Sequence, residues 1–370
     1  PDPQAATCDD GIQNGDETGV DCGGSACEPC AVNNILEGDV TTDVTLDAAI
    51  GYELAGAYVV RSGASLTIPA GTVISATGGT SAYIAVERGA QIFINGNSSA
   101  PVVMTSGSSA PAPGDWGGLV ICGDAPTNKG ANVTSEVADL TYGGSNANDN
   151  SGSIRYLRVE YTGATFSNDK EFNGVSLFGV GAGTTFEYVQ SYQGGDDGIE
   201  FFGGTVSGDY LVSIGSGDDS IDFADGWQGN GSYWYIKDGA KAGIEGSNNG
   251  DDGNASPVTT TMLSNITVVG PVTEGALYFK EGGGNFTITN FYTDGIDLGV
   301  KVKDTDAEAA VRIENGDLSI NPMQFDNTAA GFEITDYIGA NQSFVVEGPT
   351  SGAGNGAAAP SWAAGWTSGL

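Results

Sequence analysis

Pairs of aspartates recur in the middle of the chain, each pair directly after a glycine. The four residues are Asp196, Asp197, Asp218 and Asp219. A further acidic residue follows each pair at the same distance, Glu200 in the first case and Asp222 in the second. Paired carboxylates can serve as the acid and the base of glycoside hydrolysis. They can also ligate a hard cation such as Ca²⁺, or cap turns by accepting backbone N–H groups.

An internal repeat carries these acidic residues. The segment 188–201 matches 210–223 at a constant offset of 22 residues, and a third copy covers 233–245. Each copy combines a short strand pattern with a Gly-Asp or Asp-Gly turn, and no long stretch of the chain has helical periodicity. A period this short predicts one coil of a solenoid. We therefore predict an all-β fold, a right-handed parallel β-helix with coils of about 22–24 residues.

Stacking of these coils would place equivalent residues about 4.8 Å apart. We expect Ile199, Ile221 and Ile244 to form one inward row. The same stacking gathers like charges, which a bound structural Ca²⁺ ion would relieve. The predicted ligands are Asp196, Asp197, Glu200, Asp218, Asp219 and Asp222, and Glu245 in the next coil adds a further like charge to the stack. Under the alternative interpretation these carboxylates only cap turns.

A separate module rich in Cys, Asp and Gly is predicted over residues 1–31. It contains four of the five cysteines, Cys8, Cys22, Cys27 and Cys30, and almost no apolar residues. We predict two disulfides of open connectivity, with a four-cysteine zinc site as the alternative. The fifth cysteine, Cys122, lies in an apolar run and is predicted to be a buried free thiol.

The same module carries oxygen donors at short intervals. They are Asp9, Asp10, Asn14, Asp16 and Asp21. Such donors suit a second Ca²⁺ site, although the spacing is not that of an EF-hand. The alternative is a solvated acidic turn held by the disulfides.

Charge restricts the partners of the protein. The chain has 47 acidic residues against 12 Lys plus Arg and no histidine, a net charge of −35. Nucleic acid and anionic membrane surfaces are therefore poor partners. The chain has no run of about 20 apolar residues, so we predict no transmembrane segment. The acidic charge, the clustered cysteines and a start at Pro1 without an apolar leader predict an extracellular or cell-surface protein after signal-peptide removal.

Four strings in the body are specific enough to suggest a family. They are SLTIPAGTVI (65–74), PGDWGGLVICG (113–123), RVEYTG (158–163) and ADGW (224–227). Together with the two Gly-Asp-Asp coils they resemble secreted pectate-lyase-like β-helix proteins of Gram-negative bacteria, over residues 38–370. The segment 8–24 resembles a short Cys-rich module of bacterial surface proteins. These resemblances imply the fold and an extracellular location, and no established activity.

The paired aspartates also invite comparison with polygalacturonases, which use a histidine and an Arg-x-Lys pair as well. This chain has no histidine, and its body has no such pair. Six basic side chains could supply a lyase-type base, but none stands in a matching motif. They are Arg158, Lys237, Lys241, Lys280, Lys301 and Lys303. We assign no catalytic residue, and we expect a protein that is not an enzyme.

Exposed aromatic residues could bind a polysaccharide by stacking. The candidates are Trp116, Trp227, Tyr233, Trp234 and Tyr235. A tail over 351–370, which contains Trp362 and Trp366, is expected to dock on another molecule, beyond the β-helix body over 32–350. The leading interpretation is a non-enzymatic structural or adhesive protein that is stabilised by cations and self-associates into filaments or a surface layer. The alternative is a carbohydrate-active or carbohydrate-binding β-helix.

Overall fold

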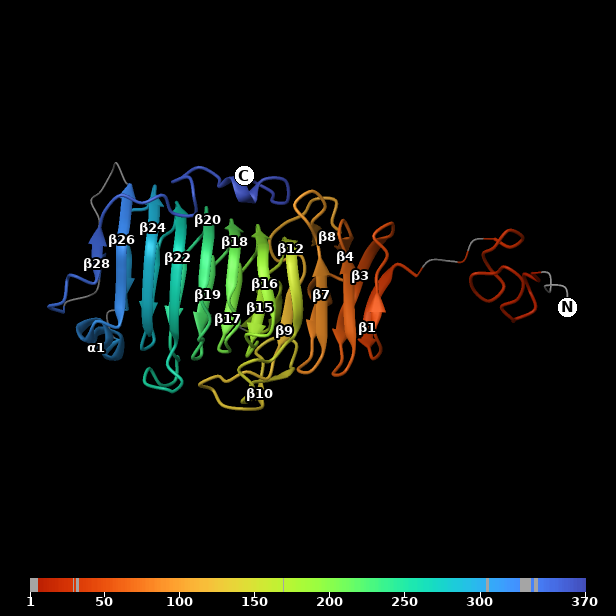
Figure 1. The fold of residues 1–370 in the computed structure, drawn as a ribbon, viewed down its shortest axis with the longest axis horizontal. Coiled ribbons are helices and arrows are strands. Elements are labelled where there is room, and N and C mark those ends of the chain that lie inside the picture. The colour runs from red at the N-terminus through yellow and green to blue at the C-terminus, as the bar shows by residue number, and fades with distance from the viewer. Residues whose placement is uncertain are drawn as a thin grey trace. The chain divides into compact units, whose positions relative to one another are not determined.

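The computed structural model describes residues 6–28, 30, 33–168, 170–303, 306–326, 334–335 and 339–370. The chain divides into two compact units, Pro1–Ile35 and Leu36–Leu370. In the larger unit, short strands of successive coils lie side by side in chain order (Figure 1). Their pairing is parallel from coil to coil. The prediction of an all-β parallel β-helix is confirmed.

One row of the β-helix consists of strands that pair in sequence, all of them long except the last. They are β12 (Gly152–Glu160), β16 (Thr185–Tyr192), β18 (Gly208–Ile214), β20 (Gly231–Lys237), β22 (Thr260–Val269), β24 (Asn285–Asp294), β26 (Leu318–Asp326) and β28 (Val345–Glu347). A second row consists of short strands. They are β6 (Tyr83–Val86), β9 (Leu119–Cys122), β15 (Val175–Phe178), β17 (Ile199–Phe202), β19 (Ile221–Ala224), β21 (Ile244–Ser247), β23 (Leu277–Lys280), β25 (Val300–Val302) and β27 (Ile334–Thr335).

The first coils and two insertions complete the larger unit. The first coils contain β1 (Ile35–Val40), β2 (Val44–Thr45), β3 (Gly51–Val60), β4 (Ser65–Pro69), β5 (Val73–Ala76), β7 (Gln91–Asn95), β8 (Val102–Ser106) and the 3₁₀ turn Gly79–Ser81. The insertion 123–151 contains an antiparallel pair, β10 (Val133–Thr134) and β11 (Thr141–Tyr142). The insertion 161–174 contains the antiparallel pair β13 (Thr165–Ser167) and β14 (Lys170–Glu171). Near the C-terminal coils lies the helix α1 (Ala307–Asn315), capped by the Asp306 side chain.

Alternation along the short strands fills the interior. Ile199, Ile221 and Ile244 pair in direct register, and all three are fully buried in the main apolar cluster. This confirms the predicted inward row. The side chain that follows each isoleucine points to the opposite face of its strand, because side chains alternate along a strand. The register of the isoleucines therefore fixes a second row, made of acidic residues, on the outer face.

A row of four tyrosines marks the bend within the long strands. Tyr156, Tyr188, Tyr210 and Tyr233 adopt the left-handed conformation, with φ between 52° and 60°. This conformation is costly for a bulky residue. Successive rings stack with centroid distances of 4.3, 4.4 and 4.8 Å. Ring stacking between coils thus offsets the backbone strain within each coil.

The C-terminal tail runs back along the coils (Figure 1). Its residues pack against the tyrosine row. Trp366 is fully buried and meets the edges of Tyr156 and Tyr188, while Trp362 meets Tyr210. The tail also exchanges two hydrogen bonds of 2.8 Å between Ser368 and the amide of Gln190. The expectation that Trp366 docks on another molecule is wrong, because its ring is already covered by the protein's own tyrosines. The short 3₁₀ turn Ser361–Ala363 presents Trp362.

Most of the aromatic side chains proposed to bind sugar are part of the core. Trp116, Trp227 and Trp234 are fully buried, and each indole N–H donates to a backbone carbonyl. Tyr235 is also buried, and its hydroxyl donates to the tail at Ala357. The expectation of an exposed stacking surface is wrong for these four residues, because they lie on inward-facing or tail-covered positions. Tyr233 is partly exposed but stacks on Tyr210.

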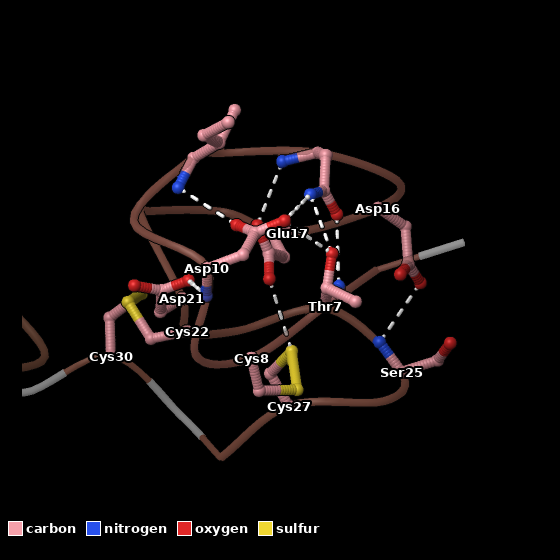
Figure 2. Close-up of a disulfide and its surroundings, with 12 residues drawn as sticks. Thr7, Cys8, Asp10, Asp16, Glu17, Asp21, Cys22, Ser25, Cys27 and Cys30 are labelled. Atoms are coloured by element: carbon pink, nitrogen blue, oxygen red, sulfur yellow. Dashed lines mark hydrogen bonds between the residues drawn. A yellow bond between two sulfur atoms is a disulfide. The ribbon is translucent and has the colours of Figure 1, made fainter. Parts of the chain in front are cut away.

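In the smaller unit, two disulfides join Cys8 to Cys27 and Cys22 to Cys30 (Figure 2). This arrangement consumes all four thiols and excludes the four-cysteine zinc site. Cys122 is a buried free thiol, as predicted. Burial raises the pKa of Cys122 to about 12, so this thiol stays protonated and unreactive at neutral pH.

We predict that the tail stabilises the β-helix through Trp366. The substitution Trp366→Ala should destabilise the protein by about 3 kcal/mol, because it removes a fully buried aromatic ring from the tyrosine row. Scanning calorimetry would measure this as a lower Tm. Leu370→Ala is the matched control, since this tail residue is 45% exposed and should leave the Tm unchanged. An unchanged Tm in Trp366→Ala would show that the tail packs without stabilising the coils.

Candidate cation site on an acidic cleft

Three neighbouring short strands present a row of carboxylates. Glu200 pairs with Asp222, and Asp222 pairs with Glu245, each as the second residue of its strand. All three residues are less than 10% exposed, although they lie on the outer face of the β-helix. We call Glu200, Asp222 and Glu245 the acidic ladder. The repeat predicted this row because the coils keep one register.

The aspartates of the Gly-Asp-Asp turns lie beside the ladder. Asp197 accepts a hydrogen bond of 2.8 Å from the backbone N–H of Asp219, and Asp219 accepts one of 2.6 Å from Ala242. Each carboxylate thus caps the equivalent turn of the next coil, which confirms the turn-capping interpretation for these two residues. In the outer pair, Lys241 donates to Asp218 at 2.5 Å.

Ladder and turn residues converge into three groups that could hold a metal ion. Within each group the carboxylate oxygens lie within 4.8 Å of one another. The groups are Asp196, Asp197 and Asp218; Asp197, Glu200 and Asp222; and Asp219, Asp222 and Glu245. All six body residues predicted as Ca²⁺ ligands belong to these groups, together with Glu245. Only Asp222 belongs to both groups that include ladder residues.

The three ladder carboxylates differ in how they are satisfied. Glu200 accepts a hydrogen bond of 2.6 Å from the amide of Asn173, and Glu245 forms an ion pair of 2.6 Å with Lys280. Within the part of the chain that the structure describes, the Oδ1 atom of Asp222 is buried without a hydrogen-bond partner. A buried carboxylate oxygen without a partner is costly, since its lost hydration is not replaced. Asp222 therefore lacks the compensation that its two neighbours have.

Burial and like charge both oppose ionisation of this cluster. Burial, and then the charge of Glu245, raise the pKa of Asp222 well above its usual range. The same two kinds of cause raise the pKa of Asp196 to about 7 and of Asp219 to about 9. Burial alone would lower the pKa of Lys280, but the nearby carboxylates, Glu245 first and then Asp222 and Glu281, together outweigh burial and raise it. The cluster thus retains protons or attracts cations.

The ladder forms the floor of a cleft with two hollows. The larger, about 410 Å³, is lined by the ladder, by Phe202 and by residues of the insertion 123–151. The smaller, about 300 Å³, adds the turn aspartates and Lys170 from the insertion 161–174. Asp222, Glu245 and Glu136 line both hollows. Ions and small molecules can therefore reach the ladder between the two insertions.

Several cleft residues were not predicted from the sequence. Asn173 and Glu136 lie in the insertions, outside the repeat, so no periodic signal aligned them with the ladder. Lys280 was noted only as a basic residue without a motif. Its position could have been derived by extending the register, because Ser247 pairs with Lys280.

The acidic residues of the N-terminal module satisfy backbone groups instead. Asp21 accepts from the N–H groups of Asp10 and Gly11, and Asp16 accepts from Ser25 (Figure 2). Asp10 accepts from Thr7 and Asn14 as well as from a backbone N–H. Among the described residues of the module, no three carboxylates converge within 4.8 Å. The amide oxygen of Asn14 already accepts from the backbone N–H of Thr7, and Asp9 belongs to no carboxylate group, so the second Ca²⁺ site stays a prediction.

The coils and the cleft both lie within a region that matches a known family model. Residues 38–367 match the model of the pectate-lyase like beta helix domain. The chain belongs to this family. No curated protein and no solved structure matches it. This membership confirms the resemblance to pectate-lyase-like β-helix proteins, whereas secretion, a bacterial source and the Cys-rich surface module stay predictions. The ligand of the cleft has to be argued from the cleft itself.

We predict that, without divalent cations, the acidic cluster makes the protein less stable as the pH rises. The folded state retains protons that the unfolded chain loses above about pH 4, so stability should decrease from there through about pH 9, the raised pKa of Asp219. The substitution Asp219→Asn keeps an acceptor for Ala242 and removes this proton, so its Tm should fall less steeply over the same range.

The control for this experiment is Glu53→Gln, which neutralises an exposed glutamate on β3. Its Tm should follow the wild-type pH profile, because general charge repulsion is common to both proteins. Equal slopes for Asp219→Asn and wild type would contradict the raised pKa.

Proposed function

We propose that this member of the pectate-lyase like beta helix family is a non-enzymatic extracellular structural or adhesive protein that is stabilised by Ca²⁺ bound at the acidic ladder. The observation that carries the proposal is the buried Asp222 oxygen, which lacks a partner within the described residues and lies between two other carboxylates. A divalent cation would supply the missing partner and offset the like charges at once.

Calcium suits this site better than magnesium. Ca²⁺ accepts 6–8 oxygens in flexible geometry, whereas Mg²⁺ requires a nearly ideal octahedron. The spacing of the coils, rather than a dedicated loop, sets the positions of the ladder oxygens, so nothing arranges these oxygens in the octahedron that Mg²⁺ requires. Bidentate carboxylates of Asp197, Glu200 and Asp222 could supply most of the ligands.

The extracellular assignment rests on chemistry that suits an oxidising, salt-containing medium. Two disulfides tie the N-terminal module. The net charge of −35 is tolerated best where salt and divalent cations screen it. Among the described helices, none is long and apolar enough to cross a membrane.

The cleft geometry weighs against a lyase-type base. Lys280, the lysine nearest the ladder, is held by Glu245, and its pKa is raised, so its ammonium group resists deprotonation. Lys241 is likewise paired with Asp218, which raises the pKa of Lys241. The second candidate function, a carbohydrate-active protein, is favoured by one observation. Asp196, with a pKa of about 7, could donate a proton in the cleft.

We predict that Ca²⁺ raises the Tm through Asp222. At a free concentration of 100 times the Kd, binding should stabilise the folded state by about 2.7 kcal/mol. Calorimetry in Ca²⁺ and in chelator should show a clear shift for wild type and for Glu53→Gln. Asp222→Asn should show a much smaller shift, and in chelator it should be at least as stable as wild type, because an amide needs neither a bound proton nor a cation to be neutral. If Ca²⁺ leaves the Tm of the wild-type protein unchanged, the proposed site is wrong.

We also predict that Ca²⁺ promotes self-association. Acidic bodies repel one another unless cations bridge them, so polymers should form in Ca²⁺ and disperse in chelator. Electron microscopy and analytical ultracentrifugation of the full chain would measure this. A monomer at high protein concentration in Ca²⁺, together with cleavage of a polysaccharide, would favour the carbohydrate-active alternative.

A further inference from the structure

We infer that an uncharged face beside the end of the tail binds the same face of a second copy of this chain, and that this contact needs no cation. The inference goes beyond the proposed function, which attributes self-association to Ca²⁺. Residues 62–114 contain one of the 47 acidic residues, Glu87, and one basic residue, Arg88. The segment 348–370, which forms the tail, contains no charged residue. Nearly all of the negative charge of the protein therefore lies outside these two segments.

The end of the tail lies against one loop of the uncharged segment 62–114. Gly365 lies so close to the loop 96–101 that an added Cβ atom would be 2.7 Å from the carbonyl oxygen of Ser98. The tail and the loops next to β8 lie along the same side of the coils (Figure 1). The two uncharged segments are thus neighbours in space as well as alike in charge.

A second loop of the same segment, 107–114, reaches the tail end through two tyrosines. Gly369 packs against the ring of Tyr192, which meets the edge of Tyr161 at a centroid distance of 6.0 Å. The backbone carbonyl of Tyr161 accepts from the N–H of Asp115, directly after this loop, at 3.1 Å. All exposed residues of the loop are uncharged. The tail end and the two loops therefore form one continuous uncharged surface.

Two valines extend this surface beyond the tail. Val73 pairs with Val103, and Val103 pairs with Arg158, so the three residues form one outward row. The tail reaches Arg158, which donates to the carbonyl of Trp366 at 3.3 Å and is neutralised by Glu160 at 2.5 Å. Val73, two coils further on, is 42% exposed. The row thus presents polar side chains where the tail covers it and valines where the tail has ended.

The tail end adds a hollow to this surface. The hollow measures about 320 Å³, and uncharged residues of the segment 359–370 line it. A contact of a face with itself requires complementary shapes on that one face. The hollow and the exposed side chain of Val73 supply one shape of each kind. We call the loops 96–101 and 107–114, the two valines and the segment 359–370 the uncharged face.

Charge selects a second copy as the partner of the uncharged face. Two bodies that each carry a net charge of −35 repel one another wherever carboxylates face carboxylates. The core of a protein interface is depleted in charged residues, and the uncharged face meets this condition on both copies. A basic partner would instead be attracted to the acidic surfaces elsewhere. A twofold contact of this face with itself produces a closed dimer, which Ca²⁺ then links into the larger polymers of the proposed function.

Sedimentation velocity of the full chain in chelator tests the inference. We expect a concentration-dependent dimer that becomes tighter as the salt concentration rises, because salt screens the remaining repulsion between the two bodies. The substitution Ala364→Glu adds a carboxylate at an exposed position that lines the hollow. In a twofold contact it places like charges in one interface, so dimerisation should weaken by about tenfold or more.

A second face variant and a control complete the experiment. Ser109→Glu changes an exposed residue of the loop 107–114 and should weaken the dimer as well. Thr287→Glu is the matched control, since Thr287 is exposed on β24, several coils away, and this variant should dimerise as wild type does. Because all three positions are exposed, scanning calorimetry should give each variant the Tm of the wild-type protein.

The outcomes separate this inference from the proposed function. A wild-type chain that stays monomeric in chelator at high protein concentration overturns the inference, while the Ca²⁺-dependent Tm shift remains a separate test of the cation site. If both face variants dimerise as readily as wild type, another surface forms the dimer and the inference is wrong. A monomer that binds dextran, and loses this binding in Ala364→Glu, would assign the face to a neutral polysaccharide and also overturn the inference.

Discussion

The in-register parallel pairing of coils is the constraint on which the rest of this structure depends. Each strand pairs with the equivalent strand of the next coil, so chemically equivalent residues meet about one strand spacing apart. For isoleucine this spacing is favourable, since it builds a continuous apolar interior. For carboxylates it concentrates like charge. The repeat thus produces the stable core and the strained acidic ladder by the same rule.

Two outer rows show opposite consequences of this rule. In the tyrosine row, the left-handed backbone conformation of each tyrosine is unfavourable, and ring stacking between coils offsets this cost. The acidic ladder has no such internal compensation. Asn173 and Lys280 satisfy its two ends, and Asp222 in the middle keeps a buried oxygen without a partner among the described residues. A cation is the simplest group that can complete the ladder.

The insertions turn a row of charges into a site. Without the segments 123–151 and 161–174, the ladder would lie on an open outer face, where water screens each carboxylate. With them, Glu200, Asp222 and Glu245 are buried at the bottom of a cleft, so their charges interact strongly and select what can enter. In this chain the coils thus supply the scaffold, and the two insertions supply walls of the cleft above the ladder.

The sequence alone determined those features of the fold and of the site that follow from the repeat. The coil length, the inward isoleucine row, the outer carboxylate row and the turn-capping aspartates all follow from one period, because register is a local property that propagates from coil to coil. The disulfide module was also readable, since clustered cysteines have few partners to choose from, although their pairing required the structure.

Only the tertiary structure decided what covers each row. Trp366 and the tail return along the coils to the tyrosines, and Glu136 and Asn173 reach the ladder from insertions that share no period with it. These contacts join residues far apart in the chain through loops without a repeat. No local pattern encodes them, so burial of the ladder, and with it the case for a cation, came from the folded chain.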